Sequence, residues 1–251
     1  MLIDSHLHLE QFEDIGAVHA EAIDAGVTGF VCVSQERQSM QKVLELLDRF
    51  PESVIPALGV HPVEVTRLSD EDVEEALEFM ADHLERVGEV GEVGLDYKWA
   101  ETAAAQERQA EILTRQLDLA AEYGKPVNLH SRRCLRQVMD RAIAFHRDTG
   151  LNAQLHWFTQ SSKLVRICND EGIYMSVGPT VLYQEQTQEV ASAISDELLL
   201  LETDAPVPIG GQEGHPRRVR EVAAKLAELK GISLADIAAL TGSNFTRFLG
   251  R

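Results

Sequence analysis

The chain has 251 residues, of which 44% are hydrophobic, and a formal net charge of −18. No apolar run approaches the ~18 residues of a membrane span, and the first residues lack the basic and apolar regions of a secretory signal, so we expect a cytoplasmic protein that does not enter membranes. The acidic balance argues against nonspecific nucleic-acid binding, which depends on Lys and Arg neutralising phosphates, but it does not exclude a nuclease, because bound metal ions add positive charge at the phosphate.

Short apolar or β-branched runs alternate with amphipathic helical stretches along the whole chain. The predicted strands are residues 2–4, 29–33, 54–58, 90–95, 126–129, 153–155, 173–177 and 198–202. Strand followed by helix, repeated in this way, favours a parallel sheet, and eight such units close naturally into a (β/α)8 TIM barrel. A doubly wound open sheet is the alternative, but no GxGxxG follows the first strand. We therefore predict an α/β fold, a (β/α)8 TIM barrel.

Helix signals lie between the predicted strands and after the last of them. One apolar face at 3.6-residue spacing contains Ile112, Leu113, Gln116, Leu117, Ala120 and Tyr123. Ser69 and Ser233, each followed by Asp three residues later, are typical of capping boxes. The stretch from Ser233 predicts one extra C-terminal helix, with a buried face of Ile237, Leu240, Phe245, Phe248 and Leu249. No linker, internal repeat or low-complexity stretch interrupts the pattern, so we expect residues 1–251 to form a single domain.

An HxH pair lies at the end of the first predicted strand. Residues i and i+2 of a strand point to the same side, so His6 and His8 can reach one ion together while Leu7 packs the other way. Such a pair by itself is also found on surfaces and in cores. Its position favours the metal, because the active sites of (β/α)8 barrels are built at the carboxyl ends of the strands.

Ionisable side chains recur at the carboxyl ends of further predicted strands. They are His61, Glu92, Asp96, His130, His156, Glu202 and Asp204. Each alone could be a helix cap, a satisfied polar group or a salt-bridge partner. Together they predict a metal centre, because burying so many ionisable groups in one barrel mouth costs roughly several kcal/mol each unless ions pair them.

Five motifs, in this order and at these spacings, resemble those of the TatD family of metal-dependent deoxyribonucleases in the amidohydrolase superfamily. They are DSHLH at residues 4–8, GVHP at 59–62, GEVGLDY at 91–97, KPVNLHSR at 125–132 and LLLETDAP at 199–206. The resemblance runs from Leu2 to the closing GSNFTRF at 242–248, and so covers essentially the whole chain. Together the motifs are very specific to the family and much less specific to a substrate.

The resemblance implies two divalent metal ions, Mg²⁺, Mn²⁺ or Zn²⁺, and a ligand set of His6, His8, Glu92, His130, His156 and Asp204. In the family's arrangement the first-strand histidines and Asp204 hold one ion, the two later histidines hold the other, and Glu92 bridges them. Asp204 and Glu92 are the predicted catalytic residues. Asp204 can take the proton of the attacking water as a general base, and Glu92 ties both ions together.

Four residues are predicted to contact the substrate. His61 matches a strand-three histidine of the family that contacts substrate, and Arg132 and Arg217 follow the fifth and eighth strands at the same rim. A locally basic lip can therefore exist on an acidic protein. Trp157 can stack on a splayed base or simply pack the rim. Family members often carry Cys in place of Trp157 and Arg or Asn before a Pro where this chain reads GGQEGHPRR at 210–218, and these departures concern the substrate.

The residues and the resemblance together predict a metal-dependent hydrolase, a TatD-type deoxyribonuclease that acts on single-stranded DNA or 3′ ends as a monomer. The alternative is an esterase or amidase such as a D-aminoacyl-tRNA deacylase, because the same activated water attacks carbonyl carbon equally well. Activity on an acyl ester and none on DNA would distinguish the two. A non-catalytic partner subunit is a third possibility, against which the complete ligand set argues.

Overall fold

Eight parallel strands form one sheet in the order of the chain, each hydrogen-bonded to the next. The computed structural model describes residues 1–159 and 161–250. Its strands are β1 (Ile3–Leu7), β2 (Gly29–Val33), β3 (Val54–Leu58), β4 (Glu89–Asp96), β5 (Val127–Arg132), β6 (Ala153–Leu155), β7 (Tyr174–Val177) and β8 (Leu199–Leu201). The sheet curls into a nearly closed barrel, which confirms the predicted (β/α)8 fold.

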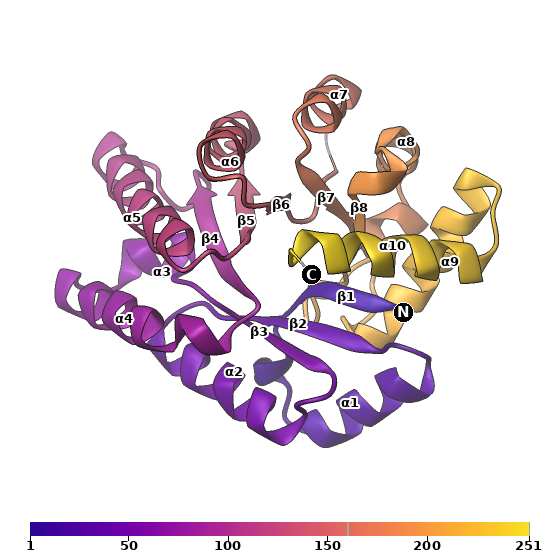
Figure 1. The fold of residues 1–251 in the computed structure, drawn as a ribbon, viewed down its shortest axis with the longest axis horizontal. Helices are drawn as coiled ribbons and strands as arrows, with labels where there is room; N and C mark the ends of the chain where they lie inside the picture. Colours follow the sequence, from indigo (N-terminus) through magenta and orange to yellow (C-terminus); the bar gives the residue numbers. More distant parts are fainter. Residues whose placement is uncertain (160, 251) are drawn as a thin grey trace.

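The helices lie outside the strands and cover the barrel wall (Figure 1). They are α1 (Ile15–Asp24), α2 (Arg37–Arg49), α3 (Pro62–Arg67), α4 (Asp70–His83), α5 (Ala103–Glu122), α6 (Leu135–Thr149), α7 (Ser162–Asp170), α8 (Glu185–Ala193), α9 (Val219–Lys230) and α10 (Leu234–Phe248). Ser69 and Ser233 cap α4 and α10 through capping boxes, as predicted. The predicted apolar face of α5 is buried from Ile112 to Ala120, because residues at 3.6-residue spacing face the sheet together.

The barrel closes between β1 and β8 through the backbone of residues at its mouth. The amide of Asp204 donates to the carbonyl of His6 over 2.9 Å, and the amide of His8 donates to the carbonyl of Ala205 over 2.7 Å. The first predicted strand is longer than expected and includes His6, and its pairing with β2 shifts register between Asp4 and Leu7. The closure therefore brings the first and last strands together at the predicted ligands His6, His8 and Asp204.

Helix α10 covers the opposite, amino end of the barrel and lies across the front of the molecule in Figure 1. Its Phe245 and Phe248 pack in a small apolar cluster with Ile3 and Tyr174, which begin β1 and β7. The side-chain amide of Asn244 donates to the carbonyl of Leu199 over 2.8 Å, at the start of β8. The extra C-terminal helix predicted from the sequence thus closes the barrel floor, and the mouth stays on the other side.

The barrel interior between floor and mouth is polar. The amide of Asn128 on β5 donates to the carbonyl of Ser5 on β1 over 3.1 Å and to Oε1 of Glu89 over 2.8 Å. Gln154 on β6 donates to Oγ of Ser5 over 3.1 Å and to Oγ of Ser176 over 2.9 Å. Since β5 and β6 do not neighbour β1 in the sheet, the contacts of Asn128 and Gln154 with Ser5 cross the interior. A buried hydrogen-bonded layer therefore supports the mouth from below.

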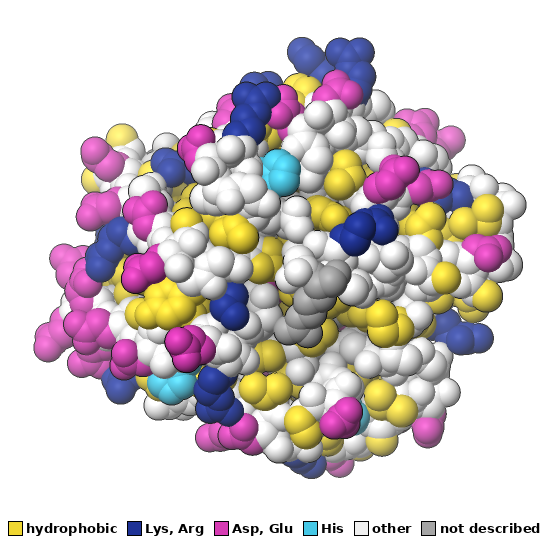
Figure 2. Space-filling view, viewed as in Figure 1, with side chains coloured by type: hydrophobic (Ala, Val, Ile, Leu, Met, Phe, Trp, Pro, Cys, Tyr) yellow, Lys and Arg dark blue, Asp and Glu magenta, His cyan; other side chains and the backbone are white. Residues whose placement is uncertain are grey.

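Acidic side chains gather at the edge of the molecule where α4 lies (Figure 2). The first turn of α4 carries Asp70, Glu71 and Asp72, all exposed. Carboxylates there interact favourably with the positive end of the helix dipole. Within residues 1–159 and 161–250, no helix combines the length and the apolar composition that a membrane span requires.

Candidate metal centre

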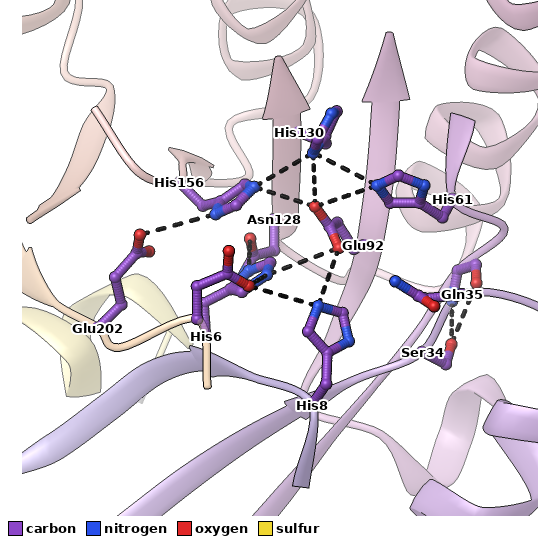
Figure 3. A network of polar contacts seen from close by, with 12 residues as sticks. His6, His8, Ser34, Gln35, His61, Glu92, Asn128, His130, His156 and Glu202 are labelled. Atoms are coloured by element: carbon purple, nitrogen blue, oxygen red, sulfur yellow. Dashed lines mark hydrogen bonds and ion pairs between the residues drawn. The ribbon is translucent and has the colours of Figure 1, made fainter. Parts of the chain in front are cut away.

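The carboxylate of Glu92 lies at the centre of a group of histidines at the barrel mouth (Figure 3). Its Oε1 lies 2.7 Å from Nδ1 of His130 and 2.9 Å from Nε2 of His156. Its Oε2 lies 3.6 Å from Nε2 of His6 and 3.5 Å from Nε2 of His8. The two oxygens of one carboxylate therefore face two different pairs of imidazoles, which is the geometry of a ligand that can bridge two ions.

Asp204 joins one of these two pairs. Its Oδ1 lies 3.5 Å from Nε2 of His6 and 3.4 Å from Nε2 of His8. The backbone of Asp204 has a φ of 53°, in the left-handed region that non-glycine residues rarely adopt. Such strained positions are held by their surroundings and concentrate at functional sites. The structure thus brings together all six of the residues that the sequence analysis named as ligands.

Each of the four histidines in these pairs turns its second ring nitrogen to an oxygen farther from the centre. The nitrogen–oxygen distances are 2.9 Å for His6 to Asn128, 3.8 Å for His8 to Glu10, 3.2 Å for His130 to Asp96 and 3.7 Å for His156 to Glu202. In metal sites a hydrogen bond of this kind, as made by His6 and His130, fixes the tautomer and the orientation of a ligating imidazole, whereas Nδ1 of His8 and Nδ1 of His156 have no hydrogen-bond partner among the described residues. The four rings are therefore oriented with one nitrogen toward Glu92 and the other toward a supporting group.

The state of His6 shows that a cation fits the centre. The amide nitrogen of Asn128 donates to Glu89 and to the carbonyl of Ser5, so its Oδ1 is the atom that accepts the proton on Nδ1 of His6. Nε2 of His6 then carries a lone pair, and it is buried without a hydrogen-bond partner among the described residues. Buried polar atoms are nearly always satisfied. A metal ion between this lone pair and the carboxylates would satisfy it.

Opposite charges dominate the electrostatics of the centre. Burial alone would raise the pKa of Glu92, but His61, His6 and His156 around it hold that pKa well below its ordinary value. Burial alone would lower the pKa of His8, but the carboxylates of Asp204 and Glu92 outweigh it and raise the pKa to about 9. Without a metal, the imidazoles of His8 and His156 are therefore protonated and the carboxylates of Glu92 and Asp204 are ionised. A divalent cation can replace those protons, as expected of a site whose ligands must deprotonate.

His61 lies against the same carboxylate but differs from the four other histidines. Its Nε2 lies 3.5 Å from Oε1 of Glu92 and 3.4 Å from Nδ1 of His130. Its Nδ1 accepts the backbone N–H of Val63 over 3.1 Å, at the start of α3. An N–H can only donate, so the proton of the neutral ring lies on Nε2. Distance alone would group His61 with Glu92 and His130 as ligands, but its inward nitrogen presents a hydrogen and no lone pair.

The remaining predicted substrate contacts are spread around the rim. Arg132 ends β5 and is exposed. Trp157 directly follows His156, is half-buried and lines a cavity between the loops that follow β5 and β6. Arg217 instead forms an ion pair with Glu21 on α1. The structure therefore places Trp157 close to the ligands and engages Arg217 in a contact between elements of the outer layer.

Sequence reasoning missed three supporting residues, Glu10, Glu89 and Asn128. Asn128 was visible as a polar residue inside the apolar run PVNL, two positions before His130 and thus on the same side of β5. Glu10 follows His8 by two residues. Glu89 begins β4 and is fully buried. Period-2 spacing from a predicted ligand was the signal that would have found Asn128 and Glu10.

The chain is similar to known proteins over nearly its whole length. The sequence profile of the family described as "TatD related DNase" matches residues 3–250. A metal-dependent hydrolase of Bacillus subtilis (strain 168), YabD, described as uncharacterized, is 31% identical over 259 residues, covering 98% of each chain. The deoxyribonuclease TATDN3 of Homo sapiens is 29% identical over 256 residues, covering 97% of this chain and 92% of its own.

A solved structure supports the same relationship. The TatD homologue YJJV of Escherichia coli K12 superposes with a TM-score of 0.87 at 30% identity, covering 100% of this chain and 98% of its own. The resemblance drawn from the five motifs is confirmed, and so is the prediction of a hydrolase. The chain belongs to the TatD family of metal-dependent hydrolases.

Proposed function

We propose that the chain hydrolyses phosphodiester bonds of DNA with two divalent ions held at the barrel mouth. His6, His8 and Asp204 would hold one ion, His130 and His156 the other, and Glu92 both. The observation that carries the proposal is that the two oxygens of Glu92 face these two histidine pairs separately, at 2.7–2.9 Å and 3.5–3.6 Å. When bound, two such metal ions supply an activated water and positive charge at the attacking and leaving oxygens.

Asp204 is the proposed general base. Burial alone would raise its pKa, but the hydrogen bond from His8 and the charges of His6 and His8 lower it below the ordinary value. The carboxylate is therefore ionised at neutral pH and able to accept the proton of a water at the mouth. His61 is the proposed donor on the other side, because its Nε2–H faces the centre and can bond to a non-bridging or leaving oxygen of the substrate.

The proposed substrate is DNA as single strands or 3′ ends. Support comes from human TATDN3, a relative that is described as a deoxyribonuclease, and from the net charge of −18. An acidic protein gains little from long-range attraction to a duplex, so affinity has to come from contacts close to the ions. We further propose Mg²⁺, Mn²⁺ or Zn²⁺ as the ions, a monomer whose residues 1–251 act as one domain, and a cytoplasmic location.

The test uses purified protein loaded in turn with Mg²⁺, Mn²⁺ or Zn²⁺. The substrates are end-labelled single-stranded DNA, double-stranded DNA, RNA and a D-aminoacyl-tRNA. We expect metal-dependent cleavage of single-stranded DNA or of 3′ ends, with EDTA-treated protein and the Glu92→Gln variant as controls. Deacylation of the tRNA without any cleavage of DNA would overturn the proposal in favour of the esterase alternative. Equal activity of the Glu92→Gln variant would show that the cleavage belongs to a contaminant.

A further inference from the structure

A cavity of about 350 Å³ lies between the loops that follow β5 and β6. Its walls include Ser131 and Trp157, which directly follow His130 and His156 in the sequence. The rings of those two histidines lie side by side at the centre, with 3.4 Å between Nδ1 of His130 and Nε2 of His156. Cavities of about this size, ~300 Å³ and above, hold small ligands. This one is lined by residues of the same two segments that carry His130 and His156.

Arg133 gives the cavity a positive charge that no residue of the described chain neutralises. It lines the cavity and is exposed. Arg136 on the same wall is paired with Asp140, and Arg217 at the rim is paired with Glu21. For Arg133 the described residues offer neither an ion-pair partner nor a side-chain hydrogen bond. Its guanidinium is thus available for an anion, and Arg binds phosphate with two parallel hydrogen bonds.

Trp157 supplies an aromatic wall without an aromatic partner. Its side chain is half-buried and, in the part of the chain that is described, stacks on no other ring. Its φ of 47° and the φ of 62° at Arg133 both lie in the left-handed region, so strained backbone holds both of these cavity-lining residues. A free indole face beside a cation suits a nucleobase next to its phosphate.

The first turn of α6 adds further donors to the same wall. Leu135, Arg136 and Gln137 line the cavity, and the residue before them, Cys134, gives the helix no side-chain cap. The first amides of a helix have no partner inside it, and they can bind phosphate oxygens. The first turn of α6, Arg133 and Trp157 therefore line one cavity.

We propose that this cavity is a nucleotide subsite that binds the residue next to the scissile phosphate, on the side of His130 and His156. The base stacks on Trp157, and its phosphate binds Arg133 and the first turn of α6. The proposal rests on the proposed function, because it assigns the neighbouring nucleotide of the same substrate. It names Arg133, which the sequence does not single out, in the role that was expected of Arg217.

Binding is tested by fluorescence, because Trp157 and Trp99 are the chain's two tryptophans. Trp99 is 49% exposed and lies in the loop after β4, so Trp99→Phe leaves Trp157 as the single reporter. The Mg²⁺-loaded variant is titrated with thymidine 5′-monophosphate, which has no phosphodiester to cleave. We expect saturable quenching, weakened about tenfold by adding Arg133→Gln, since a charged hydrogen bond to phosphate is lost. Inorganic phosphate alone should not quench, because it lacks the base.

Catalysis is tested on single-stranded DNA with Trp157→Ala and Arg133→Gln. Loss of one stacked base or one phosphate contact should raise KM about 5- to 50-fold and change kcat little. The metal content of both variants should stay that of the parent. Arg141→Gln is the matched control, since Arg141 lies on α6, which follows Arg133, donates to Thr114 and does not line the cavity. It should leave KM unchanged.

The outcomes separate this proposal from the proposed function. Quenching by thymidine 5′-monophosphate together with a raised KM in both variants supports the subsite. Unaltered KM in both variants of an active deoxyribonuclease, with no quenching, overturns the subsite and leaves the nuclease function intact. If the parent cleaves no DNA, the proposed function fails, and the fluorescence titration alone decides the subsite: saturable quenching that Arg133→Gln weakens supports it, and its absence overturns it.

Discussion

The backbone amide of Val63 donates to Nδ1 of His61 over 3.1 Å, and this single bond sets His61 apart from the ligand histidines. The neutral ring must carry its proton on Nε2, 3.5 Å from Oε1 of Glu92. Burial, more than the neighbouring charges, lowers the pKa of His61, so the ring is neutral at neutral pH. His61 therefore faces the centre as a hydrogen-bond donor.

We predict that His61→Asn lowers turnover and leaves both ions in place. Asn is a good residue at a helix start, so α3 keeps a cap while the imidazole is lost. Removal of a proton donor typically costs ~10²-fold or more in kcat. Metal content per chain and kcat are measured on the same preparation. A variant that has lost one ion per chain would show that His61 is a ligand after all.

We predict that Glu92→Gln empties both ion positions, whereas His130→Ala empties mainly one. The two carboxylate oxygens of Glu92 face both histidine pairs, whereas His130 belongs to one pair and contacts only Oε1 of Glu92. The measurement is metal per chain after dialysis against a fixed free metal concentration. Equal loss from the two variants would contradict a bridging role for Glu92.

We predict that Asp204→Asn lowers kcat ~10²–10⁴-fold and KM much less. Asn tolerates the left-handed backbone at this position, where φ is 53°, so the fold of the mouth should survive. An amide cannot accept the water's proton at neutral pH. The assay is run at saturating metal, so that ion loss is not mistaken for lost proton transfer. Near-normal kcat would leave Asp204 as a ligand only and exclude it as the general base.

We predict a pH-dependent gain in stability from Glu89→Gln. Burial, only partly offset by the hydrogen bond from Asn128, raises the pKa of Glu89 from 4.5 to about 8. Between these values the unfolded carboxyl is ionised and the folded one is protonated. The free energy of unfolding therefore falls as pH rises from 4.5 to about 8, by at most about 1.4 kcal/mol per pH unit, and Gln at this position removes that loss.

Urea unfolding of both proteins at pH 5, 6, 7 and 8 checks this prediction. The stability difference between Glu89→Gln and the parent should grow across the range and level off above it. Glu71→Gln, at an exposed position of α4, is the control and should give a constant difference. A constant difference for Glu89→Gln as well would show that the folded carboxyl is already ionised at pH 5.

The sequence predicted the barrel and the ligand histidines because both follow from local pattern. Alternation of strands and helices defined the fold, and the carboxyl ends of strands marked where His6, His130 and His156 had to meet. Parallel strands bring those ends together whatever the helices between them contain. The motifs of the family then divided the ligands between two ions, and the placement of Glu92 between the histidine pairs agrees with that division.

The supporting layer could not be predicted in the same way, because its contacts join distant strands. The hydrogen bond between His6 and Asn128 joins residues 122 positions apart. The sequence around either residue does not indicate that the two side chains pair. The roles at the rim depend on how loops fold back onto helices. Arg217 is paired with Glu21, 196 residues away in the sequence, whereas Arg133 next to a ligand strand is unpaired among the described residues.

Because α10 closes the barrel floor, the chain termini and the barrel mouth lie at opposite ends of the molecule. The N-terminal amine contacts the carbonyl of Ala238 on α10, so both chain ends lie on the floor side. A surface anchor, a fluorophore or a fused partner attached to either end would point away from the mouth. The protein can therefore be immobilised through its termini with the barrel mouth turned to the solution, so that the proposed nuclease activity can be assayed on a surface.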